Sequence, residues 1–394
     1  MFDTIIIGAG PAGLSAAGIL QEKQKVLVLD EYFHAGGRLL GQLYEEKKGK
    51  WWNGLEIARK LVSDTQDKTE IRLSTSVYDV ELDDTYTVHT TSGTFRSRHL
   101  IIATGSREKS NPLPEWDLPG VMTVGAAQVL TNFSRVRPGD KGVIVGINPL
   151  SMVIAMELGY ADIDVAKICL PPENLLSTQK PEDAFETLVS LGHSAPSRFI
   201  STGAGLAGKA KPIHPAALKL FPKNGIRAMG LPISIKEKII RINGTEKVES
   251  VTVQKTDSKG KPLNGKTREV KCDFVCISDG LAPLSEIGSL LNLKHVYAES
   301  LGGYVPLHSE MMETELPNLY VAGNVTGIEN AKVAMYQGQL AAHKILGDED
   351  AAMRSLSAIT HERKNAKVKF HKDLLQGRET VETMWREIEK RKAE

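Results

Sequence analysis

This sequence has few cysteines, no marked excess of charge of one sign and no long apolar run. The three cysteines, Cys169, Cys272 and Cys276, are an odd number and contain no CxxC pair. Neither a disulfide framework nor a dithiol redox centre is therefore encoded. Lys and Arg number 49 against 48 Asp and Glu, which gives a formal charge of +1. Without a broad positive field, nucleic acid is not expected as a partner.

Signals for export or membrane insertion are also missing. The longest apolar run near the start covers residues 4–9, which is too short for a signal sequence and follows no basic residue. No later run approaches the ~20 apolar residues of a membrane-spanning helix. We therefore expect a cytoplasmic protein without a membrane span.

What is present is the composition of a globular protein. A hydrophobic fraction of 41% and a charged fraction of 25% argue against disorder over most of the chain. A length of 394 residues exceeds that of one ordinary core, so roughly two to three domains are expected.

The same strand, glycine turn and helix occur twice along the chain. In the first instance a strand at residues 3–7 precedes a turn at 8–13, a helix at 14–21 and a second strand at 25–30. In the second instance the corresponding segments are residues 142–145, 146–151, 152–158 and 164–170. Two such βαβ openings predict an α/β fold with two Rossmann-like, doubly wound domains.

Further strands and helices follow from the apolar pattern. Residues 270–277 read as one strand, which would bring Cys272 and Cys276 to the same side as core residues. A helix is expected at residues 331–346, after a strand and Gly323. The polar tail beyond Asp350 has the composition of a helix.

The first glycine turn has the residues of a dinucleotide-binding site. Gly8 permits the sharp turn, Gly10 lets the backbone approach a pyrophosphate, and Gly13 lets the helix pack closely on the strand. Pro11 and Ala12 complete the turn, and backbone N–H groups at the helix start face the phosphates.

An acidic residue is expected to bind the adenosine ribose. Asp30 ends the next strand, about 20 residues after the turn, where a carboxylate can accept both ribose hydroxyls. The adjacent Glu31 is the alternative, and Asp30 is favoured because the strand pattern ends on it.

Several segments together resemble the two-domain flavoprotein reductases typified by thioredoxin reductase. The segments are the first glycine turn, Asp30, Gly36-Gly37-Arg38, Ile102-Ala-Thr-Gly105 and Leu319-Tyr-Val-Ala-Gly-Asn324. The resemblance implies FAD in the first unit, a nicotinamide cofactor in the second, and a late segment that returns to the first. It therefore implies a discontinuous FAD-binding domain at 1–110 and 295–346, an NAD(P)-binding-like domain at 111–294, and a C-terminal helical tail at 347–394.

The same resemblance assigns further residues to the FAD site. Gly36, Gly37 and Arg38 match the loop over the FAD phosphates and ribose, and Ala103, Thr104 and Gly105 match the end of a neighbouring strand. Gln42 matches a polar residue near the flavin, and Val77 a strand that meets the adenine; both are alternatively ordinary loop and core residues. Gly323 and Asn324 correspond to the ribitol segment, where the family has Asp and the Asn324 amide is a weaker acceptor. Lys332 is either a positive charge near the flavin or a solvated side chain.

The second glycine turn departs from the fingerprint. Gly146-Ile-Asn148-Pro-Leu-Ser151 keeps only the first glycine, and the next strand ends in Pro171-Pro172 without an acid or an arginine for a ribose. NAD(P) binding therefore has at least equally strong alternatives, which are a Rossmann-like domain used as a scaffold or for docking, or one that holds a different nucleotide.

A closer resemblance narrows the family. Residues 112–122 with Gly125-Ala-Ala127, Gly280-Leu-Ala-Pro283 and residues 324–337 resemble the α-type FAD subunits of amine and amino-acid dehydrogenases. Sarcosine oxidase α, hydrogen cyanide synthase B, opine oxidase A and dye-linked proline dehydrogenase α form this group. Such subunits pair with an amine-oxidising flavoprotein and relay its electrons. Nothing after Cys276 is cysteine, so an iron–sulfur segment is absent and no metal site is identified.

The expected function is that of an FAD-dependent oxidoreductase, in which the cofactor supplies the reactive atoms and no catalytic side chain is identified. An electron-transfer subunit of a heteromeric amine or amino-acid dehydrogenase or oxidase is favoured. A stand-alone NAD(P)H:acceptor reductase and a non-catalytic flavin-binding scaffold are the alternatives. A small-molecule electron donor and a homo- or hetero-oligomer are expected. The basic and apolar residues of the tail, among them Arg363, Lys367, Arg378 and Trp385, predict an amphipathic helix that packs on this protein or a partner, or else is solvated.

Overall fold

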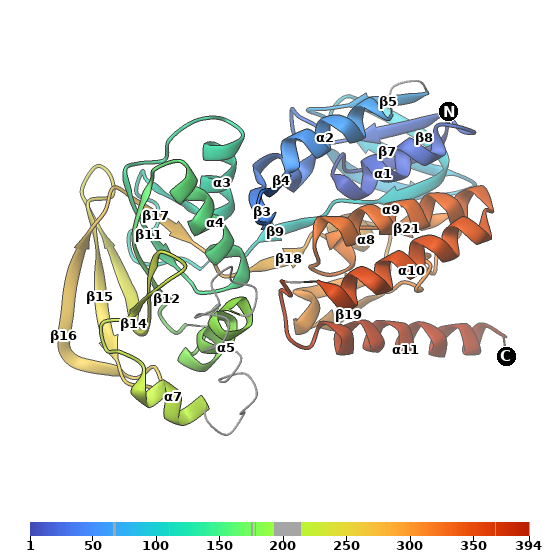
Figure 1. Ribbon diagram of the computed structural model, residues 1–394. Helices are drawn as coiled ribbons and strands as arrows, with labels where there is room; N and C mark the ends of the chain where they lie inside the picture. Colours follow the sequence, from blue (N-terminus) through green and yellow to red (C-terminus); the bar gives the residue numbers. More distant parts are fainter. Residues whose placement is uncertain are drawn as a thin grey trace. The chain divides into compact units, whose positions relative to one another are not determined.

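The N-terminal apolar stretch forms a central strand of a mostly parallel sheet. The computed structural model describes residues 1–65, 68–109, 111–174, 176–177, 179–192, 214–366 and 368–393 (Figure 1). The chain divides into a first unit of Met1–Leu40, Asn53–Arg107 and Leu281–Glu394, and a second unit of Gly41–Trp52 and Glu108–Gly280.

Seven strands in the described part of the first unit form one sheet, in the order β5, β2, β1, β8, β7, β6, with β21 beside β8. Strand β1 (Phe2–Ile7) is parallel to both β2 (Val26–Leu29) and β8 (Gly93–Ile102). These strands are apolar nearly throughout because both faces of a parallel sheet are covered. The remaining strands of this unit are β5 (Thr69–Arg72), β6 (Val77–Leu82), β7 (Tyr86–Thr90), β9 (Ser106–Glu108), β18 (Leu281–Pro283), β19 (His295–Ala298), β20 (Gly303–Pro306) and β21 (Leu319–Val321).

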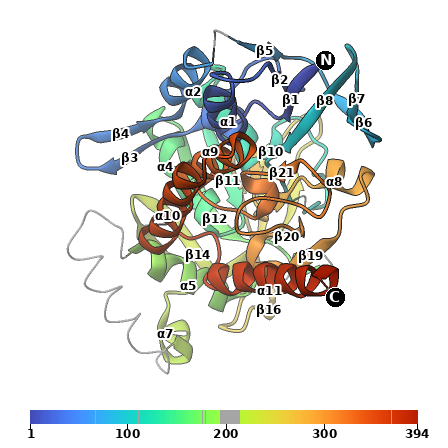
Figure 2. The ribbon, with the colours of Figure 1, turned by 90° about the vertical axis from the view of Figure 1, so that its right-hand side faces the viewer.

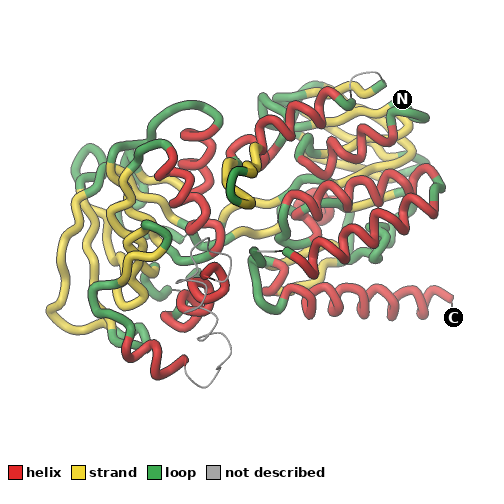
Figure 3. Tube along the Cα trace, in the orientation of Figure 1, coloured by secondary structure: helices red, strands yellow, loops and turns green. Residues whose placement is uncertain are grey.

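Helices cover both faces of this sheet (Figure 3). Ile6, Val28 and Ile101 face a core that contains residues of α1, α9 and α10. The alternate residues Ile5 and Leu27 face a second core with residues of α8. The helical segments of the unit are α1 (Pro11–Leu20), η1 (Gly37–Gly41), α2 (Gly54–Ser63), α8 (Glu286–Leu290), η3 (Glu299–Leu301), η4 (Asn324–Thr326), α9 (Ala331–Leu346), α10 (Glu349–Asn365) and α11 (Leu374–Ala393).

The second unit contains an eight-stranded mixed sheet within its described residues, in the order β10, β17, β11, β12, β14, β15, β16, with β13 beside β14. Pairing is parallel from β10 to β14 and antiparallel beyond it. The strands are β3 (Leu43–Lys47), β4 (Lys50–Asn53), β10 (Val121–Thr123), β11 (Lys141–Val145), β12 (Asp164–Leu170), β13 (Ile226–Ala228), β14 (Leu231–Asn243), β15 (Ser250–Thr256), β16 (Pro262–Lys271) and β17 (Phe274–Ile277). The helices among the described residues of this unit are α3 (Val124–Asn132), α4 (Pro149–Tyr160), α5 (Pro181–Gly192) and α7 (His214–Leu220).

The fold class predicted from the sequence, two Rossmann-like α/β domains, is confirmed by these two sheets. The expected strand at 164–170 and helix at 331–346 have the observed bounds. Both helices that follow the glycine turns begin earlier than expected, at Pro11 and Pro149, because proline is favourable in the first helical turn.

Two local expectations were wrong. The single strand at 270–277 is two strands, β16 and β17, that lie at different places in the sheet, so Cys272 lies between them and Cys276 lies in β17. The single amphipathic tail helix is two helices, α10 and α11, and Lys367 lies outside the described residues. Across the described segments, no helix is both long enough and apolar enough to cross a membrane.

Candidate functional site

Two glycines of the first turn are required by packing inside the protein. A Cβ on Gly8, whose φ is 112°, would lie 2.3 Å from the carbonyl oxygen of Ala103. A Cβ on Gly13 would lie 1.9 Å from the carbonyl oxygen of Gly8. The turn therefore needs glycine at both positions to join β1 to α1.

The third glycine, Gly10, is not required by the protein itself. A Cβ on Gly10 would meet no atom within 4 Å. Gly10 is also the N-cap of α1, where no side chain caps the helix, and Pro11 contributes no N–H. The first N–H groups of α1 are thus left without a capping side chain beside an open space, which is the arrangement that binds a phosphate group.

Asp30 lies against this turn. Its Oδ2 accepts a hydrogen bond from the backbone N–H of Ala9 at 2.6 Å, and its Oδ1 accepts one from Tyr32 at 2.8 Å. Burial raises the pKa of Asp30, and the two backbone hydrogen bonds oppose that shift. Glu31 is exposed. Of the two acidic residues, Asp30 is therefore the one whose carboxylate is fixed at the turn.

The structure brings the loop at 36–38 to the same turn. The N–H of Gly36 donates to the carbonyl oxygen of Ala9 at 2.7 Å, and a Cβ on Gly37 would lie 3.0 Å from the Cα of Gly10. Arg38 donates through Nη2 to the carbonyl oxygen of Ser106 at 3.0 Å.

The strand end at 103–105 forms another side of this region. The N–H of Ala103 donates to the carbonyl oxygen of Ile7 at 2.8 Å. Thr104 donates through Oγ1 to the carbonyl oxygen of Leu284 at 2.5 Å, and Gly105 accepts from the N–H of Leu284 at 3.0 Å. Residues 7, 103 and 284 are far apart along the sequence, so segments distant in the chain form the site together.

The late glycine segment reaches the first helix. A Cβ on Gly323 would lie 3.0 Å from the Cβ of Ala12. Asn324 accepts from the N–H of Glu329 at 3.1 Å, so the oxygen assigned to a ribitol hydroxyl already has one partner. Lys332 is half-buried in the first turn of α9.

Val77 and Gln42 are the sequence-predicted residues with the weakest connection to this region. Val77 begins β6, two residues after Thr75, whose N–H donates to the carbonyl oxygen of Asp30 at 2.9 Å. Gln42 belongs to the second unit, where its Oε1 accepts from the Trp52 indole at 2.9 Å. The structure thus assembles the first glycine turn, Asp30, Arg38 and Asn324 in the first unit, whereas Gln42 belongs to the second unit.

These residues fit a dinucleotide such as FAD. The open space at Gly10 together with uncapped N–H groups suits a pyrophosphate, and Asp30 retains lone pairs for hydroxyl groups. The fit rests on Gly10, because glycine there has no reason in the packing of the protein.

The second glycine turn makes the same backbone hydrogen bond as the first, but it differs in what its N–H groups bind. The N–H of Gly146 donates to Cys169 at 2.8 Å, as that of Gly8 donates to Leu29 at 2.7 Å. A Cβ on Gly146 would lie 1.9 Å from the carbonyl oxygen of Ser278. The first position of the fingerprint is therefore structurally equivalent in the two units.

The protein's own side chains occupy the N–H groups of this second turn. Asn148 caps α4, accepting from the N–H of Ser151 at 3.0 Å, while Ser151 Oγ accepts from the N–H of Asn148 at 3.0 Å. Gln179 accepts from the N–H of Ile147 at 3.0 Å and donates to its carbonyl oxygen at 2.6 Å. The N–H groups of Ile147, Asn148 and Ser151 thus already have side-chain partners, which leaves this turn less open to an NAD(P) pyrophosphate than the first turn.

The buried side chains of the cysteines exclude them from an exposed redox centre. Cys169, Cys272 and Cys276 are free and buried. Burial raises the pKa of the Cys272 thiol to about 12, and it raises those of Cys169 and Cys276 as well. The thiolate is the reactive form, so these thiols are unreactive in the folded protein.

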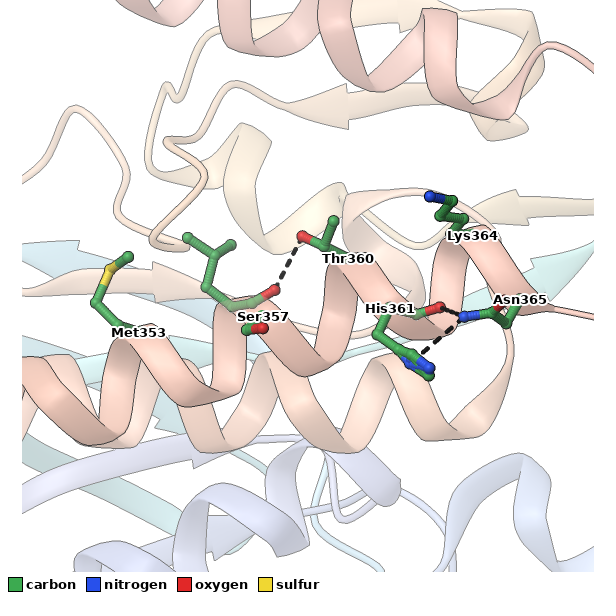
Figure 4. A pocket seen from close by; sticks show the side chains of 7 residues that line it. Met353, Ser357, Thr360, His361, Lys364 and Asn365 are labelled. Carbon is green, nitrogen blue, oxygen red and sulfur yellow. Dashed lines mark hydrogen bonds between the residues drawn. The ribbon is translucent and has the colours of Figure 1, made fainter.

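A groove on α10 contains none of the residues assigned to the dinucleotide site (Figure 4). Its polar side chains bond within the helix: Thr360 donates to the carbonyl oxygen of Leu356 at 3.0 Å, and Asn365 to that of His361 at 2.8 Å. All of its lining residues belong to this one helix, and none is assigned to the dinucleotide site, so we assign no site there.

Sequence reasoning missed the partners that fix these sites. Gln179 lies in a segment without periodicity, and Arg363 and Arg378 were read only as basic residues of a tail. Both arginines bond to Glu329, which directly follows the late glycine segment. The signal for Asn148 was present in the sequence, because Asn followed by Ser three residues later is a helix-capping pattern.

Two Rossmann-like units with a dinucleotide-type turn define a class of oxidoreductase. Residues 2–177 match the model of the family described as pyridine nucleotide-disulphide oxidoreductase. This segment, which contains both glycine turns, is similar to that family, and the oxidoreductase class expected from the sequence is confirmed.

The relatives also confirm the resemblance to dehydrogenase subunits. Opine oxidase A of Rhizobium meliloti (strain 1021), which is named as a subunit, is 29% identical over 372 residues, which cover 88% of this chain and 71% of that protein. The structure of L-proline dehydrogenase from P. horikoshii matches with a TM-score of 0.64 and 20% identity, over 91% of this chain and 58% of that chain. Thioredoxin reductase from Lactococcus lactis matches with a TM-score of 0.60 and 18% identity, over 90% of this chain and 100% of that chain. At these identities the two structures show the fold alone.

Proposed function

We propose that this chain binds FAD in its first unit and is the electron-transfer subunit of a heteromeric amine or amino-acid dehydrogenase or oxidase. The observation that carries the proposal is the contrast between the two glycine turns. The first leaves N–H groups and an open space at Gly10, whereas Asn148, Ser151 and Gln179 occupy the second. In this proposal the electron donor is therefore not NAD(P)H.

The proposal gives a role to several residues around the first glycine turn. The N–H groups at the start of α1 bind the pyrophosphate, Asp30 accepts the adenosine ribose hydroxyls, and Gly36, Gly37 and Arg38 cover the phosphates. Asn324 orients the ribitol, and Lys332 adds positive charge near the flavin. When bound, FAD accepts a hydride or an electron pair and passes it on.

The partner in this proposal is an amine-oxidising flavoprotein, and its small-molecule substrate is the electron donor. The support is that the relative in Rhizobium meliloti is named as a subunit of opine oxidase. The second unit, with its turn occupied, then serves as a scaffold or docking domain, and the complex is cytoplasmic.

Cofactor uptake and the source of electrons are tested in one series. The apoprotein is titrated with FAD, and the complex is then titrated anaerobically with NADH and NADPH while the visible flavin absorbance is followed. We expect FAD to bind and neither nicotinamide to bleach it. Bleaching at stoichiometric NAD(P)H would instead identify a stand-alone reductase.

The relay is tested by adding the purified product of a neighbouring gene with an amine or amino acid. Bleaching that needs both the second protein and the amine is the expected result. FAD binding without reduction by any donor would indicate a flavin-binding scaffold, and failure to take up FAD would reject the proposal as a whole.

A further inference from the structure

The loop that joins β21 to α9, residues 323–330, is held by both C-terminal helices. Arg378 of α11 donates through Nη1 to the carbonyl oxygen of Thr326 at 2.7 Å, and through Nη2 to Oε1 of Glu329. Arg363 of α10 donates to Glu329 at 2.8 Å through Nε and at 2.9 Å through Nη2. A second bond from α10 joins Glu362 to Asn330 at 3.0 Å.

These charges are unusual for a terminal segment because they are buried. The exposed fraction of the side chain is 5% for Glu329, 6% for Arg378 and 12% for Arg363. Burial acts to raise the pKa of Glu329, but the charges of Arg378 and Arg363 lower it below its ordinary value. Burying charges has a large desolvation cost, so a buried ion-pair cluster is weak evidence that the cluster stabilises the fold.

The position of α11 is fixed independently of this cluster. Leu374 and Val381 of α11 pack with Val296 and Leu301 in a core cluster. A Cβ on Gly377 would lie 2.3 Å from Oγ of Ser300, so the helix approaches η3 closely. Arg378, the next residue, is therefore presented to the loop by a helix that has its own apolar contacts. Figure 2 shows α11 beside β19.

Two further hydrogen bonds, one to α9 and one within the loop, also hold this segment. The N–H of Gly323 donates to Oε1 of Gln337 at 2.9 Å, and the N–H of Glu329 donates to Oδ1 of Asn324 at 3.1 Å. Glu329 thus connects the arginines to Asn324 through its own backbone. A displacement of Glu329 would move the Asn324 side chain that the proposed function assigns to the ribitol.

We propose that Arg378 and Arg363 are positioning residues for the cofactor: acting through Glu329 and Thr326, they hold loop 323–330 in the conformation that binds the ribitol and flavin part of FAD. This inference rests on the proposed function, because it concerns the affinity for FAD. In this inference the C-terminal helices support the cofactor site through the loop that they hold.

The test compares Arg378→Gln and Arg363→Gln with a matched control, Lys390→Gln, which removes an exposed positive charge from the same C-terminal segment. FAD affinity is measured by titrating each apoprotein, and Tm is measured with and without FAD. We expect Arg378→Gln to weaken FAD binding by roughly ten-fold, because misplacing Asn324 would lose a hydrogen bond to the cofactor, which is worth about that factor in affinity. Arg363→Gln should weaken it less, since Arg378 remains, and Lys390→Gln should leave it unchanged.

A purely structural role gives a different pattern. It would lower the Tm of apoprotein and complex equally and leave the FAD affinity and the FAD-induced rise in Tm unchanged, which would overturn the inference. If Arg378→Gln does not fold, Arg363→Gln and the conservative Arg378→Lys, expected to recover part of the affinity, decide the question by the same measurements. Failure of the wild-type protein to bind FAD would reject the proposed function, whereas equal binding by wild type and variants rejects only this inference.

Discussion

Asn148 and Ser151 cap each other across the first turn of α4, through two hydrogen bonds of 3.0 Å between the side chain of each and the backbone N–H of the other. Asn148 also donates to the carbonyl oxygen of Ser278 at 3.1 Å. The residue that breaks the glycine fingerprint in the second unit is thus a structural part of that unit.

Replacing Asn148 by Ala should lower the free energy of unfolding by about 1–2 kcal/mol, the upper part of the range for a lost helix cap. The loss should exceed that of Asn53→Ala, because Asn53 caps α2 through a single bond of 3.3 Å at an exposed site. Urea unfolding of the two variants and the wild type measures both. Equal losses would contradict a special role for Asn148.

Substitutions at Gly10 and Gly13 should separate binding from folding. Gly13→Ala should lower stability by about 1–3 kcal/mol or more, as overpacking does, because the new Cβ would lie 1.9 Å from a backbone oxygen. Gly10→Ala should leave the Tm of the apoprotein nearly unchanged, because its Cβ meets nothing within 4 Å. It should nevertheless greatly reduce FAD uptake, measured by flavin absorbance after gel filtration. A stable Gly10→Ala protein that retains FAD would show that the pyrophosphate does not bind at this turn.

Glu157 should make the stability of the second unit depend on pH. Its carboxyl is 2% exposed and accepts bonds from Gln128 at 2.8 Å and Asn132 at 2.7 Å. Burial raises the pKa of Glu157 from 4.5 to about 8, against the opposing effect of these hydrogen bonds. Between these two values the folded state binds more protons than the unfolded state, so the stability contributed by this group falls as the pH rises.

The comparison of wild type with Glu157→Gln isolates this effect. We expect the free energy of unfolding of the wild type, minus that of Glu157→Gln, to decrease from about pH 5 to pH 8. The exposed Glu182→Gln serves as the control, and its difference from wild type should stay constant. Parallel pH profiles for wild type and Glu157→Gln would contradict the prediction.

The three cysteines should be unreactive toward a thiol reagent in the native protein. Burial raises the pKa of each thiol and removes it from solvent. A chromogenic disulfide reagent should detect almost no thiol under native conditions and three per chain in denaturant. Rapid reaction of even one thiol in the native protein would contradict this prediction and would be compatible with electron transfer through a thiol.

The local pattern of the sequence was sufficient for the fold class and for the core of the candidate site. Apolar strands, glycine spacing and the acidic residue after β2 are read within about 30 residues, and β1, the turn at 8–13 and Asp30 depend on interactions of that range. The helix at 331–346 has the predicted bounds, and its N-cap Asn330 and C-cap Gly347 directly flank it, so the signals that end it are local.

The tertiary structure alone decided which N–H groups remain open and which charges meet. Gln179 reaches Ile147 across 32 residues, Asn148 reaches Ser278 across 130, and Arg378 reaches Glu329 across 49. A given spacing of glycine and asparagine is compatible with a turn whose N–H groups are open or occupied. In the same way, a basic C-terminal segment is compatible with arginines that are solvated or buried. Such contacts depend on where distant segments pack, and no local propensity carries that information.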